Sequence, residues 1–148
     1  MSLSIFYGSV FGNAQNVAEK LHEHLLGNGI ESNVVTKPTV EDFHNATAIF
    51  VVTSSCGQGE VPPNLEEVIS EIDEQRPNLN DKRFAVATLG DSSYVDTYCG
   101  AGKKVFKILE DCNGKAIAPL LEVDAIETFE ADVDVIEWVD GIINDLTQ

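Results

Sequence analysis

Residues 3–27 read LSIFYGSVFGNAQNVAEKLHEHLLG, and they join an apolar run, a glycine-bracketed loop and an amphipathic segment. The run LSIFY at 3–7 predicts a buried β-strand. The segment at 14–27 predicts an α-helix that Gly27 or Gly29 can end. Its apolar residues recur at helical spacing and share one face: Val17, Ala18, Leu21, Leu25 and Leu26. The stretch therefore predicts a strand–loop–helix unit.

The rest of the chain repeats this alternation. Further strands are expected at 32–36, 48–55 and 83–90, an interrupted fifth strand at 116–123, and helices at 65–75, 101–112 and 134–145. Strands that are apolar almost throughout indicate a parallel sheet covered on both faces, because each strand is then buried on both sides. We therefore expect an α/β protein with a doubly wound five-stranded parallel sheet, strand order 2-1-3-4-5 and helices on both faces. One domain is expected to span 1–148.

Composition limits the classes of function. The formal net charge of −16 argues against a nucleic-acid partner, because phosphate backbones select basic surfaces. Solubility and steering toward a basic partner both explain this charge. Three cysteines without CxxC spacing argue against a disulfide framework or a zinc site, and His22 and His24 lie two residues apart and face different ways on a helix. No apolar run reaches membrane-spanning length and no secretion signal is recognisable, so a cytoplasmic location without a membrane is expected.

In such a sheet, ligands bind beyond the carboxyl ends of the strands, which directs attention to the loops at 8–13, 54–63 and 90–100. The first loop, GSVFGN, contains no cationic side chain, yet backbone N–H groups at a helix N-terminus bind phosphate without one. Gly8 and Gly12 permit a tight path, and Ser9 and Asn13 offer hydrogen bonds. The alternative is that Ser9 or Asn13 only caps the helix. The spacing does not match the dinucleotide, Walker or nucleophile-elbow motifs.

The second and third loops are also rich in glycine and polar residues. TSSCGQGEVPPN at 53–64 is long for a connection in this kind of fold, which favours a function over an ordinary turn before a helix capped by Asn64. LGDSSYVDTYCGAGK at 89–103 contains Tyr94 and Tyr98, which suit stacking on a flat ring. The alternative is that these rings fold back over the core.

Together, GSVFGNA, TSSCGQGEVPPN and LGDSSYVDTYCGAGK resemble the three flavin loops of short-chain flavodoxins and of the FMN domain in diflavin reductases of the cytochrome P450 reductase type. The resemblance implies a flavodoxin-like fold, FMN as cofactor, and an electron carrier rather than a substrate-converting enzyme. It implies that residues 9–14 wrap the phosphate, that Tyr94 stacks on the flavin ring, and that Asp124 contacts the ribityl chain. The cofactor-binding residues that it implies are Ser9, Val10, Phe11, Gly12, Asn13, Ala14, Ser54, Ser55, Cys56, Gly57, Gln58, Gly59, Leu89, Gly90, Asp91, Tyr94, Tyr98, Cys99 and Asp124.

The chain departs from the flavodoxin pattern at a few positions. Phe11 and Asn13 stand where the family often has threonines, so phosphate binding is expected to depend more on backbone amides. Cys56 stands where reductase FMN domains often have a stacking aromatic residue.

The resemblance also implies redox partners for a monomeric carrier. Electrons would come from a pyridine-nucleotide-dependent flavodoxin or ferredoxin reductase and pass to a cytochrome P450 or another redox enzyme. Both would dock on an acidic rim formed by Glu60, Glu66, Glu67, Asp91 and Asp96. The alternatives are a flavin-binding accessory or maturation module without a carrier role, and a structural domain that kept the fold and lost the ligand.

Overall fold

The computed structural model describes residues 2–54, 60–90, 99–124, 128 and 130–147. The central layer is a parallel sheet whose strands follow the order β2-β1-β3-β4, with β5 and β6 both paired to β4. The strands are β1 (Leu3–Gly8), β2 (Ser32–Val35), β3 (Ala48–Ser54), β4 (Arg83–Gly90), β5 (Lys115–Ala116) and β6 (Leu121–Asp124). The predicted doubly wound fold and its strand order are confirmed.

The fifth strand is interrupted, as predicted, and forms two short segments. β5 pairs with the start of β4 through Arg83↔Lys115, and β6 pairs with its end, where Gly90 lies opposite Asp124. Pro119 lies between the two segments and has no N–H to donate to the ladder. The break therefore leaves β6 to continue the sheet at the carboxyl end of β4.

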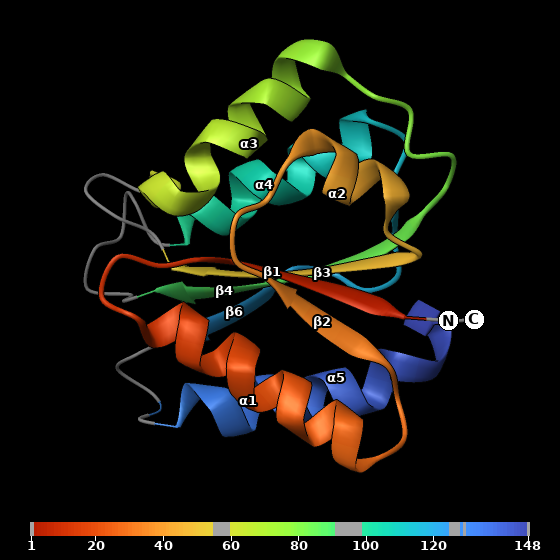
Figure 1. Cartoon of the computed structure of the whole chain (residues 1–148). Helices are drawn as coiled ribbons and strands as arrows, with labels where there is room; N and C mark the ends of the chain where they lie inside the picture. Colours follow the sequence, from red (N-terminus) through yellow and green to blue (C-terminus); the bar gives the residue numbers. More distant parts are fainter. Residues whose placement is uncertain (1, 55–59, 91–98, 125–127, 129, 148) are drawn as a thin grey trace.

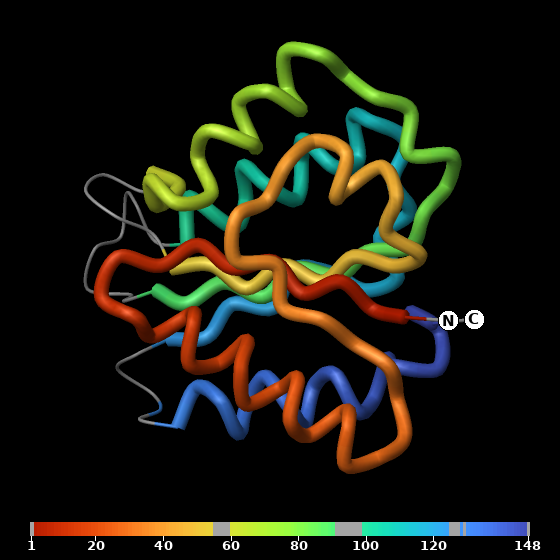
Figure 2. Tube along the Cα trace, viewed as in Figure 1, coloured from red at the N-terminus to blue at the C-terminus, as the bar shows by residue number. Residues whose placement is uncertain are grey.

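Helices cover both faces of the sheet (Figure 1). The helices α1 (Asn13–Gly27) and α5 (Ala131–Thr147) lie on one face, and α2 (Val40–Asn45), α3 (Pro63–Gln75) and α4 (Gly100–Asp111) lie on the other. The trace in Figure 2 shows that the loop from β1 to α1 lies at one edge of the molecule, opposite the start of β1 and the end of α5. None of the helices in the described ranges combines the length and apolar character needed to cross a bilayer.

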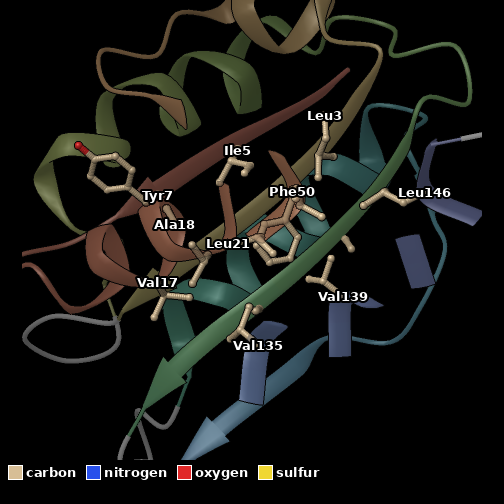
Figure 3. Packing of buried hydrophobic residues seen from close by; sticks show 14 of the residues in the cluster. Leu3, Ile5, Tyr7, Val17, Ala18, Leu21, Phe50, Val135, Val139 and Leu146 are labelled. Carbon is tan, nitrogen blue, oxygen red and sulfur yellow. The ribbon is translucent and has the colours of Figure 1, made fainter. Parts of the chain in front are cut away.

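Each face of the sheet has its own core, because successive side chains of a strand point to opposite sides. Leu3, Ile5 and Tyr7 of β1 pack toward α1 and α5, where Figure 3 shows Leu21 and Phe50 between the layers. The intervening residue of β1, Phe6, packs on the opposite side with α2, α3 and α4. The sheet is thereby fixed in place from both faces, which also fixes the edge where its strands end.

Two local features differ from what the sequence analysis described. The helix α2 was not predicted: Thr39 caps it in a capping box with Asp42, and its buried Phe43 stacks on Phe6 with ring centroids 3.9 Å apart. Leu26 was expected on the buried face of α1 but is 52% exposed. Successive residues of a helix are turned by about 100° from one another, and Leu25 occupies the direction that faces the core.

Candidate functional site

The carboxyl ends of β1, β3, β4 and β6 meet at one edge of the sheet, on the left in Figure 1. The structure describes part of the predicted site there: residues 9–14, Ser54, Leu89, Gly90, Cys99 and Asp124. The remaining predicted residues lie outside the described ranges: Ser55, Cys56, Gly57, Gln58, Gly59, Asp91, Tyr94 and Tyr98. The same holds for Asp96 of the predicted acidic rim.

The loop after β1 turns into α1 through a left-handed glycine. Gly12 is the N-cap of α1 with a φ of 90°, a conformation that residues other than glycine rarely adopt. The hydroxyl oxygen of Ser9 accepts a hydrogen bond from the N–H of Gly12 at 2.8 Å, which closes the turn. Neither Ser9 nor Asn13 caps the helix, so the alternative role considered for them is wrong.

The start of α1 has the electrostatic character that an anion requires. The first turn holds no acidic residue and receives no hydrogen bond from a capping side chain. Its N–H groups and the helix dipole therefore present positive potential at the loop. Ser9 accepts a bond from Gly12 and still has a hydroxyl hydrogen to donate. These donors fit a phosphate group, although no lysine or arginine lies in the loop.

Gly8 leaves room for the side chain of Thr53 where β1 and β3 end. A Cβ at this position would lie 2.4 Å from Oγ1 of the buried Thr53, which is far inside van der Waals contact. The backbone oxygen of Gly8 accepts a hydrogen bond from Oγ of Ser54 at 3.2 Å. Ser54, a predicted site residue, thus connects the second loop to the first.

Asn64 has a different role from the one its sequence position suggested. The N-cap of α3 is Pro62, which makes no side-chain cap bond, so the alternative in which Asn64 caps this helix is wrong. Instead, Oδ1 of Asn64 accepts a hydrogen bond from the N–H of Ser9, and Nδ2 donates one to the backbone oxygen of Tyr7, both at 2.8 Å. Asn64 therefore belongs to the site's framework, which the sequence did not reveal because its partners lie far along the chain.

A cavity of about 390 Å³ lies between the first turns of α1 and α5, beside the ends of β4 and β6. It brings together Asn13, Leu89 and Gly90 from two of the three predicted loops; the full lining is Asn13, Asn16, Val17, Leu89, Gly90, Val123, Thr128, Ala131 and Asp132. Its volume falls within the range of small-molecule sites. Asp124 is 8% exposed, lies opposite Gly90 in the sheet register and directly follows Val123 of this lining.

Two predicted residues occupy contrasting environments. Cys99 is fully buried at the N-cap of α4 with a φ of 56°, so its thiol packs as a small core side chain. Phe11 is 93% exposed and its neighbour Val10 is 47% exposed. The side chain of Phe11 therefore contacts little of the rest of the described chain.

The topology, the glycine-bracketed loop and the open start of α1 define a doubly wound α/β protein whose switch point offers hydrogen-bond donors suited to an anion. A family model described as Flavodoxin matches residues 5–138. The chain belongs to the flavodoxin family, whose members are FMN-binding flavoproteins of electron transport.

Individual relatives agree with this membership. The MioC homolog of Haemophilus influenzae is 34% identical over 146 residues, covering 99% of both chains. The sulfite reductase [NADPH] flavoprotein alpha-component of Bacillus subtilis is 34% identical over 152 residues, which cover 99% of this chain and 24% of that protein. Among solved structures, a C101A mutant of flavodoxin from Pseudomonas aeruginosa has a TM-score of 0.91 at 31% identity, covering 100% of both chains. The predicted resemblance to short-chain flavodoxins and diflavin reductases is confirmed, with FMN as the cofactor.

Proposed function

We propose that this protein carries electrons from a pyridine-nucleotide-dependent reductase, of the flavodoxin or ferredoxin reductase kind, to an acceptor redox enzyme such as a cytochrome P450. The observation that carries this proposal is the first turn of α1, which lies at the switch point of a flavodoxin fold and has no acidic residue and no hydrogen bond from a capping side chain. FMN supplies the redox chemistry, and the chain binds the cofactor and excludes water from it. We further propose a single-domain cytoplasmic monomer.

Within this proposal, the residues at the edge of the sheet have distinct tasks. Ser9 and the first-turn amides of α1 hold the phosphate, while Asn13 adds a donor at the helix start. Leu89 and Gly90 line the neighbouring cavity, and Asp124 lies beside the expected path of the ribityl chain. The positions assigned to the flavin ring remain proposals, namely 55–59, Asp91, Tyr94, Tyr98 and Cys99.

The proposal is tested by what the purified protein binds and reduces. It should be yellow, release FMN on denaturation, and accept electrons from a flavodoxin or ferredoxin reductase with a pyridine nucleotide. Transfer onward to a cytochrome P450 or another acceptor would complete the carrier assignment. A second candidate function is a flavin-binding accessory or maturation module, which the similarity to the MioC homolog equally fits. That function predicts bound FMN without transfer to any acceptor.

Electron transfer from the reductase should slow strongly as ionic strength rises. Glu60 and Glu67 are exposed on the acidic rim, whereas Glu66 is partly neutralised by Lys104 at 3.6 Å. We expect the second-order rate constant to fall about tenfold or more between low salt and about 0.5 M, since screening weakens charge steering. Reduction by a small uncharged donor is the control and should change little. A flat response with the reductase would argue against docking through the acidic rim.

A further inference from the structure

The side chain of Asn64 continues the sheet where a strand has stopped. In a parallel ladder, a residue that lies opposite residue i of the neighbouring strand accepts a hydrogen bond from the N–H of residue i+1 and donates one to the backbone oxygen of residue i−1. The amide of Asn64 makes this pair of bonds around Gly8, because it accepts from Ser9 and donates to Tyr7, each at 2.8 Å. A side-chain amide here takes the place of a backbone peptide.

The position of Asn64 beside β1 follows from the ladder. The strand β2 pairs with β1 only as far as Phe6↔Val35. The oxygen of Gly8 faces β3, since Ser54 donates to it. The backbone N–H and C=O groups of Tyr7 and Ser9 therefore face the opposite side, beyond the point where β2 ends. Consistent with this placement, Thr36 and Thr39, which follow β2, line a common cavity with Asn64.

We propose that Asn64 is a positioning residue for the phosphate-binding loop. It holds the polypeptide on both sides of Gly8, so the loop leaves β1 in one direction. The N–H of Ser9 donates a hydrogen bond to Asn64, and the N–H of Gly12 donates one to Ser9. These two backbone N–H groups therefore fix the shape of the loop, and the N–H groups at the start of α1 stay available to bind the phosphate. This inference rests on the proposed function, in which this loop holds the phosphate of FMN.

Asn64 also connects two ligand loops that are distant in sequence. It stands at the start of α3, directly after the loop at 54–63, and its bonds span 55 and 57 residues. The second loop ends where the first is anchored, and Ser54 ties the beginning of the second loop to Gly8. The second loop is therefore attached to the first loop at its beginning, through Ser54, and at its end, through Asn64.

The test compares FMN with riboflavin, which has the same ring and ribityl chain but no phosphate. In Asn64→Ala, we expect the Kd of FMN to rise about fivefold, the low end for two hydrogen bonds at an exposed side chain, while the Kd of riboflavin changes less than about twofold. Titration of flavin fluorescence into the apoprotein measures both constants. The loss should persist at high salt, because no charge is removed. Asn144→Ala, the same change at an exposed position near the end of α5, is the matched control and should leave both constants unchanged.

A second measurement keeps the result independent of overall stability. Hydrogen exchange of the Ser9 amide in the apoprotein should be faster in Asn64→Ala than in the wild type, with the exchange of β3 amides unchanged. Equal weakening of FMN and riboflavin, or no weakening of FMN, would overturn the positioning role. A wild-type protein that binds neither flavin would overturn the proposed function itself, which separates the two failures.

Discussion

Gly102→Ala is expected to destabilise the protein by about 2 kcal/mol or more, because an added methyl group cannot fit between α4 and β4. A Cβ on Gly102 would lie 2.3 Å from Cβ and 2.7 Å from Oγ1 of Thr88. Thr88 is fully buried in β4, so the helix must move outward. Alanine's better helix propensity returns only about 1 kcal/mol. Chemical denaturation monitored by circular dichroism measures the change.

Gly141→Ala is the matched control for this prediction. Gly141 lies within α5 and a Cβ there would meet nothing within 4 Å. The same substitution should therefore stabilise the protein by about 0.5–1 kcal/mol, through helix propensity and lower unfolded-state entropy. Changes of the same sign in the two variants would show that close packing of Gly102 on Thr88 does not decide the outcome.

The hydroxyl group of Thr88 also lies at this contact. Its Oγ1 is the buried side-chain oxygen that has no hydrogen-bond partner within the described ranges. Because no polar contact in the described ranges stabilises the Thr88 hydroxyl, its position under Gly102 depends on packing alone. The close approach at Gly102 brings the start of α4 against the sheet, at the end of the connection that leaves β4.

The alternating strands and helices could be predicted because parallel strands buried on both faces are apolar almost throughout. Runs such as 48–54 and 83–90 have this property. The helix α2 could not be recognised from periodicity, since its six residues bury only Phe43. The signal that was available is the capping box from Thr39 to Asp42. Short elements held by a single anchor leave little pattern in a sequence.

The site could be predicted only in part, for a related reason. The spacing of Gly8 and Gly12 before a helix indicated an anion loop, and the structure gives both glycines a conformational or packing cause. The closure of the turn by Ser9 and the two bonds of Asn64 depend on three-dimensional positions that a local pattern does not contain. An asparagine after two prolines at a helix start has the composition of a cap, and the tertiary contact overrides that local preference.

Asn13→Asp should have opposite effects on the stability of the apoprotein and on the binding of FMN. Asn13 is the exposed first residue of α1, and the first turn contains no acid. A carboxylate at this end of the helix interacts favourably with the dipole, so the apoprotein should gain about 0.5 kcal/mol. The same carboxylate would stand beside the bound phosphate of FMN. Stability and cofactor affinity should therefore separate in this one variant.

The affinity loss can be sized from the charges involved. Two unit charges about 4 Å apart in water repel by about 1 kcal/mol, and a phosphate monoester carries a charge of about −1.5 to −2. We therefore expect the Kd of FMN to rise about thirtyfold in Asn13→Asp at low salt, with partial recovery near 1 M salt, where the Debye length is about 3 Å. Riboflavin should bind almost as in the wild type. Asn144→Asp adds the same charge near the far end of α5 and should leave FMN binding nearly unchanged. If riboflavin weakened as much as FMN, or salt had no influence, the phosphate would not lie at the start of α1, and the electrostatic basis for binding an anion without a cationic side chain would be wrong.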